Sequence, residues 1–118
     1  MKIHGHFKKD FEKWYAKQKF GVALWSVRGS TYEEVGFYDK PFSMQWGVLV
    51  DFGDSVGYDL VVERHCDFDG VYHNLFEWTI RTINDSKSGF AGYEKSRHEV
   101  REQSIIKLQE IYNDNKRS

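Results

Sequence analysis

The stretch FSMQWGVLVDFGDSVGYDLVVERHCDFDGVYHNLFEWTI, residues 42–80, predicts the architecture of this chain. Its even-numbered positions are mostly apolar and its odd-numbered positions mostly polar, which is the two-residue period of strands with one buried face. Two turns divide it, at Gly53–Gly57 and at Phe68–Gly70. The stretch therefore predicts a three-stranded antiparallel meander whose even-numbered side chains face the core.

The second turn also predicts a register. A three-residue loop that ends in Gly70 suits a type I turn closed by a left-handed residue. Such a loop pairs His65 with His73 and Val62 with Phe76, so that the even positions of both strands share one face. A slip of one residue would reverse every side chain, and the segregated register is therefore favoured.

A helical period precedes the meander. Phe7, Phe11, Trp14 and Tyr15 recur at the spacing of one helix face, and this helix should end near Gly21. Residues 22–28 then read as a short strand and residues 31–37 as a weaker one, while the placement of residues 29–41 stays open.

A second helix is predicted at the other end of the chain. Ser96-Arg97-His98-Glu99 has the spacing of a capping box, and an apolar stripe follows it. We therefore expect an α+β fold: a three-stranded meander with one or two N-terminal strands, and N- and C-terminal helices packed on one face.

The C-terminal helix also carries a resemblance. Ser96-Arg97-His98-Glu99-Val100-Arg101, followed by Ser104-Ile105, Lys107 and Glu110-Ile111, resembles a terminal helix found in small phage and mobile-element proteins of unknown function. The resemblance covers residues 96–111. It implies a mobile-element origin and no particular activity.

Length and composition predict one domain over residues 1–118, large enough to bury a core without metals or disulfides. A single cysteine fits a reducing compartment, and there is no apolar run of membrane-spanning length, so we expect a cytoplasmic protein without membrane contact. The net charge is only −1, but residues 21–86 carry four basic and eleven acidic side chains, whereas both ends are basic. Such segregation bears on binding partners.

The predicted outer face of the meander is the first candidate site. It combines carboxylates with a small apolar patch, a composition that suits docking to a basic protein surface. The leading hypothesis is thus a non-enzymatic interaction or accessory protein, with self-association through the same patch as a variant. The residues of this candidate site are Leu49, Asp51, Asp59, Val61, Glu63 and Glu77.

Two basic residues suggest an alternative function. Arg97 and Arg101 lie one helical turn apart and could grip phosphate, so the basic helices could serve a nucleic-acid-binding module. The acidic sheet and the nearly neutral total charge argue against nucleic acid.

A further alternative is a metal-dependent enzyme. In the predicted register His65 and His73 are cross-strand neighbours with Asp67 nearby, and two imidazoles with a carboxylate can hold zinc. Two ordinary surface histidines are the favoured interpretation, because metal sites need supporting hydrogen bonds. The sequence predicts no catalytic residue and no cofactor.

Overall fold

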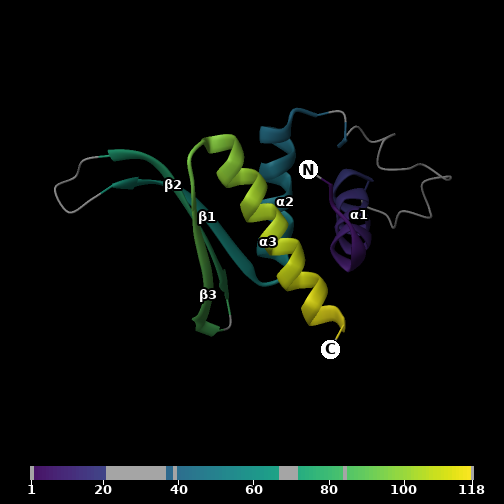
Figure 1. The fold of residues 1–118 in the computed structure, drawn as a ribbon. Coiled ribbons are helices and arrows are strands. Elements are labelled where there is room, and N and C mark those ends of the chain that lie inside the picture. Colours follow the sequence, from purple (N-terminus) through teal and green to yellow (C-terminus); the bar gives the residue numbers. More distant parts are fainter. Residues whose placement is uncertain (1, 21–36, 39, 67–71, 84, 118) are drawn as a thin grey trace.

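The structure is a computed structural model that describes residues 2–20, 37, 38, 40–66, 72–83 and 85–117. Within these residues three helices and three strands follow one another in the order ααβββα, which confirms the α+β class (Figure 1). The elements are α1 (Gly5–Phe20), α2 (Phe42–Ser55), β1 (Tyr58–Cys66), β2 (Tyr72–Thr82), β3 (Asp85–Glu94) and α3 (Arg97–Arg117).

The elements form three layers. The strands make one antiparallel sheet in the order β1-β2-β3, a meander as predicted. Helices α2 and α3 pack on this sheet, and α1 packs on α2 and α3 (Figure 1). Among the described residues α1 contacts no strand, so the expectation that both terminal helices lie directly on the sheet is correct only for α3.

The prediction of a strand at the start of the meander is wrong, because residues 42–55 form helix α2. Leu49, Phe52 and Gly53 are its buried positions, at the i, i+3 and i+4 spacing of a helix. Pro41 precedes the helix, and its carbonyl oxygen accepts the first helical hydrogen bonds. Because Leu49 is apolar in addition to the even-numbered positions around it, the sequence contains a helical stripe as well as an alternation.

The register of the hairpin is correct at its tip and displaced beyond it. Cys66 pairs with Tyr72, as the three-residue loop requires, but Val62 pairs with Trp78 after an irregularity in the ladder. The displacement is two residues. Because two is even, the faces are preserved: even-numbered residues from 58 to 62 and from 76 to 82 are buried or half-buried.

Strand β3 was not expected from the sequence. It pairs with β2 and places Gly92 opposite Trp78. A Cβ atom on Gly92 would lie 2.5 Å from the Trp78 ring, so the indole occupies the space above this glycine. The strand expected at residues 22–28, and residues 31–36 of the second, lie outside the described residues.

Aromatic rings fill the space between the three helices. Phe7 of α1 meets Phe52 of α2 edge-on at 5.3 Å and Tyr112 of α3 at 5.7 Å between centroids. Phe11 lies 4.8 Å from Phe37 and 5.6 Å from Phe52. These edge-to-face and tilted arrangements are the favourable ones for aromatic pairs, and they join α1 to the other helices.

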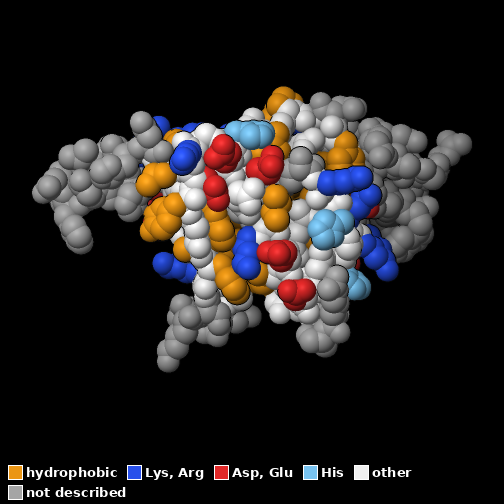
Figure 2. Space-filling model, in the orientation of Figure 1, with side chains coloured by type: hydrophobic (Ala, Val, Ile, Leu, Met, Phe, Trp, Pro, Cys, Tyr) orange, Lys and Arg blue, Asp and Glu red, His pale blue; other side chains and the backbone are white. Residues whose placement is uncertain are grey.

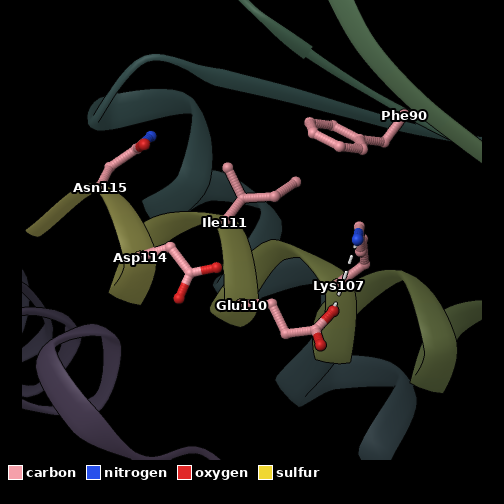
Figure 3. Close-up of a pocket in the computed structure, with 6 residues that line it drawn as sticks. All are labelled: Phe90, Lys107, Glu110, Ile111, Asp114 and Asn115. Atoms are coloured by element: carbon pink, nitrogen blue, oxygen red, sulfur yellow. Dashed lines mark ion pairs between the residues drawn. The ribbon is translucent and has the colours of Figure 1, made fainter. Parts of the chain in front are cut away.

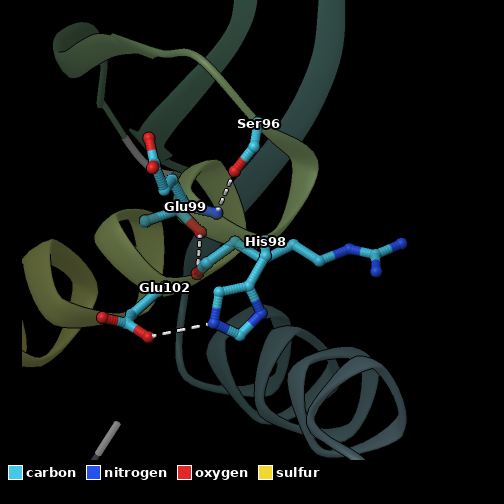
Figure 4. Close-up of polar contacts among 6 residues, drawn as sticks. Ser96, His98, Glu99 and Glu102 are labelled. Carbon is cyan, nitrogen blue, oxygen red and sulfur yellow. Dashed lines mark hydrogen bonds and ion pairs between the residues drawn. The ribbon is translucent and has the colours of Figure 1, made fainter.

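The predicted cap of α3 is present. The backbone N–H of Glu99 donates to the Ser96 hydroxyl at 3.1 Å, and His98 Nε2 lies 3.4 Å from a carboxylate oxygen of Glu102 (Figure 4). A serine hydroxyl that accepts from the third helical N–H is what starts a helix at this point. The helix therefore begins at Arg97, as the capping box indicates.

Candidate functional site

The sheet has one face turned away from the helices, which we call the outer face. Its described side chains are all exposed or half-buried, whereas the opposite face carries the buried side chains of Tyr58, Leu60, Phe76, Trp78 and Ile80. The register arranges them in three rows across β1, β2 and β3: Glu63, Glu77 and Tyr93; Val61, Thr79 and Ala91; Asp59, Arg81 and Gly89.

The outer face is acidic with an apolar centre. Val61 is 38% exposed and Tyr93 is 54% exposed. Among the described side chains of this face, three carboxylates share these rows with them, against the single guanidinium of Arg81. Glu77 accepts from the Thr79 hydroxyl at 3.3 Å and also from the Tyr93 hydroxyl, and this second contact raises the pKa of Tyr93.

Four of the six residues predicted for this face lie on it: Asp59, Val61, Glu63 and Glu77. Leu49 and Asp51 do not, because they belong to α2. Leu49 is 0% exposed and part of the core, so its assignment to an exposed patch is wrong. Asp51 is exposed, but on a helix. Tyr93 is not predicted from the sequence, because no strand is expected there.

The predicted metal site involves residues that the structure describes only in part. The backbones of His65 and His73 belong to β1 and β2, at the irregularity in the ladder between Arg64 and Cys66. Asp67 and both imidazoles lie outside the described part of the chain. Elsewhere in the described residues, no three His, Cys, Asp or Glu side chains are grouped so that they could hold a metal ion.

At the start of α3, Arg97 and Arg101 each lie next to an aromatic ring of another element. The guanidinium carbon of Arg97 is 5.0 Å from the centroid of Phe76, and that of Arg101 is 5.4 Å from Trp46. Arg64 of β1 lies over the same Phe76 ring, at 4.7 Å. We call these three arginines and two rings the arginine surface. Sequence reasoning found two of its arginines and missed the contact of both Arg64 and Arg97 with one ring.

Helix α1 presents cations to the solvent. Its two acidic residues are held by hydrogen bonds: Asp10 accepts from the Tyr112 hydroxyl at 2.6 Å, and the buried Glu12 accepts from Tyr38 at 3.0 Å. Blue and pale-blue side chains gather over this helix at the right of Figure 2. Among the described side chains of the helix, the exposed lysines are Lys8, Lys9, Lys13 and Lys17.

A groove of about 240 Å³ lies between α3 and β3 (Figure 3). Phe90 and Ile111 supply its apolar surface, and Glu110, Asp114 and Asn115 supply oxygens. Its one lysine, Lys107, lies 4.9 Å from the Phe90 centroid and 3.6 Å from Glu110 Oε2. Because this cation already has an anionic partner, the groove offers little to an anionic ligand.

Known proteins do not add to this picture: no protein-family model matches the chain, and no curated protein or solved structure shows significant similarity to it. None of the helices in the described residues is both long and apolar enough to cross a membrane. The described residues present three surfaces that could bind a partner: the outer face, the arginine surface and the cationic side of α1.

Proposed function

We propose that the protein is a non-enzymatic binding protein that docks the outer face of its sheet onto a basic surface of another protein. The observation that carries this proposal is the exposure of Val61 and Tyr93, together with three carboxylates, on a sheet face that no described helix covers. An exposed apolar patch with a charged rim is typical of a protein interaction site.

The charges of the outer face favour a basic partner. Asp59 and Arg81 lie opposite each other in the ladder and offset one another, but Glu63 and Glu77 lie side by side. Like charges directly opposite across strands repel, and a lysine or arginine of a partner would relieve this repulsion. Tyr93 lies next to Glu77 in the same row and can provide the aromatic contact that dominates many interfaces.

The proposal is tested by comparing variants of the outer face in their binding to a captured partner. Glu63→Lys changes the acidic pair, and Val61→Asp changes the apolar centre. The matched control is Glu110→Lys, which reverses an exposed charge on α3. We expect both outer-face variants to lose at least about tenfold in affinity and the control to bind as the wild type, with circular dichroism confirming that all three fold.

Self-association is the competing occupant of this face. Sedimentation velocity of the wild type and of Val61→Asp distinguishes the two. A dimer that Val61→Asp dissociates would contradict the proposal of a different partner. Equal binding of the captured protein by wild type, Glu63→Lys and Val61→Asp would show that the interface lies elsewhere.

The cationic side of α1 favours nucleic-acid binding as a second candidate. Asp10 and Glu12 of this helix accept inward hydrogen bonds, whereas four of its described lysines are exposed, and such a row can neutralise backbone phosphates. Fluorescence anisotropy with a labelled oligonucleotide at low salt tests it. Lys9→Gln with Lys13→Gln should weaken binding and Arg81→Gln on the outer face should not; no anisotropy change for the wild type would exclude this function.

A further inference from the structure

The arginine surface goes beyond the proposed function, because it lies on the helix side of the sheet. It joins four elements: Arg64 comes from β1, Phe76 from β2, Trp46 from α2, and Arg97 and Arg101 from α3. Residues distant in the sequence thus bring two guanidinium groups to the Phe76 ring, and Arg101 follows Arg97 by one turn of α3.

The aromatic rings hold these guanidinium groups in position. Phe76 is only 7% exposed and supports both Arg64 and Arg97. The Trp46 ring under Arg101 is itself held, since its Nε1 donates to the buried Ser104 hydroxyl at 3.1 Å. A guanidinium stacked on a ring loses one face to the contact but keeps its N–H edge for a planar acceptor such as phosphate.

The three guanidinium groups have no carboxylate partner in the described part of the chain. The neighbouring acid Glu102 lies 3.4 Å from His98 instead. Two cations against the single ring of Phe76 repel each other, and the positive end of the α3 dipole adds to the potential here. A bound anion would offset this repulsion, because each guanidinium group attracts it.

We propose that the arginine surface binds the phosphate groups of a small polyphosphate ligand. One arginine can bind one phosphate through two parallel hydrogen bonds. Three arginines on two separate rings therefore suit a ligand with more than one phosphate. A nucleic-acid backbone presents similar groups but is disfavoured by nearby carboxylates: Glu94 ends β3, and Glu99 and Glu102 lie in the first two turns of α3.

Isothermal titration with inorganic pyrophosphate at low ionic strength tests the proposal. We expect a saturable heat that decreases as salt is added, because salt screens the charges. Arg64→Gln and Arg101→Gln should each weaken binding by about tenfold, which is the loss expected for one charge-assisted contact. Arg81→Gln removes an exposed arginine of the outer face and should bind as the wild type.

A conservative variant separates guanidinium recognition from general attraction. Arg64→Lys keeps the charge but loses the planar group over Phe76, so it should bind pyrophosphate more weakly than the wild type. Equal binding by Arg64→Lys, or an equal loss in Arg81→Gln, would overturn the assignment to these rings. The absence of any heat would overturn it as well.

A single-stranded oligonucleotide forms the second arm of the experiment. If the oligonucleotide binds through Arg64 and Arg101 while pyrophosphate does not bind, the ligand is a nucleic acid and the proposal of a small polyphosphate is wrong. Pyrophosphate binding that is lost in both variants supports it.

Discussion

The side-chain amide of Asn113, near the end of α3, caps the first turn of α1. Its Oδ1 accepts from the Phe7 backbone N–H at 2.7 Å, and its Nδ2 donates to the His4 carbonyl oxygen at 3.3 Å. Gln109 assists one turn earlier by accepting from the His4 N–H at 2.9 Å. The first N–H groups of a helix have no partner within it, and here a residue 106 positions away supplies one.

Replacement of Asn113 should therefore destabilise the protein strongly. Asn113→Ala leaves the buried Phe7 N–H without its acceptor, and we expect the free energy of unfolding to fall by about 1–3 kcal/mol. Urea unfolding measures this. Gln103→Ala, an exposed position of the same helix, is the control and should change stability by less than about 0.5 kcal/mol. Equal midpoints for the two variants would contradict the capping role.

Gly5 should tolerate no side chain, for two separable reasons. Its φ is +66°, and an added Cβ would lie 2.9 Å from Asn113 Nδ2. We expect Gly5→Ala to cost about 1–3 kcal/mol. In the double variant with Asn113→Ala the steric part should disappear, so the two costs should not add. If the costs of Gly5→Ala and Asn113→Ala add strictly in the double variant, the clash is unimportant. The control is Gly47→Ala on α2, whose Cβ meets nothing within 4 Å and which should be neutral or stabilising.

Gly92 and Gly89 offer a matched pair within β3. Gly92→Ala places a methyl group against the Trp78 indole, 2.5 Å from its nearest atom, whereas the nearest atom to a Cβ on Gly89 is 3.5 Å away. Thermal unfolding should show a loss of about 1–3 kcal/mol for Gly92→Ala and little change for Gly89→Ala. If both variants melt together, the packing of Trp78 over Gly92 does not stabilise the sheet.

Alkaline pH should destabilise the folded state through Tyr112. Burial and the hydrogen bond to Asp10 raise the pKa of Tyr112 above its ordinary value, so the folded protein keeps this proton when the unfolded chain loses it. Stability should be unaffected by this group below about pH 10 and fall above it by at most about 1.4 kcal/mol per pH unit. Urea unfolding measured between pH 8 and pH 11 should show that the free energy of unfolding declines less steeply with pH for Tyr112→Phe than for the wild type. Equal slopes would count against this role of Tyr112.

The parts of the fold that sequence predicts well are those in which one local signal dominates. Ser96 and Glu99 define the start of α3, and the alternation from Tyr58 to Cys66 defines a strand with one buried face. The outer-face residues Asp59, Val61 and Glu63 were placed correctly because a two-residue displacement leaves the face unchanged.

The remainder depends on tertiary contacts. Residues 42–52 satisfy both a strand period and a helix period, and packing of Leu49 and Phe52 against the other helices decides for the helix. Strand β3 is rich in small residues and has little strand preference of its own. It forms because β2 offers a free edge and because Trp78 requires a glycine opposite.

The layered arrangement has a consequence for native-state hydrogen exchange. Helix α1 packs on α2 and α3 and, within the described residues, contacts no strand. It can therefore open as a separate cooperative unit while the sheet and its two covering helices stay closed. Backbone amides of α1 should accordingly exchange with deuterium by a lower-energy opening than those of β2, the strand enclosed on both sides by neighbours.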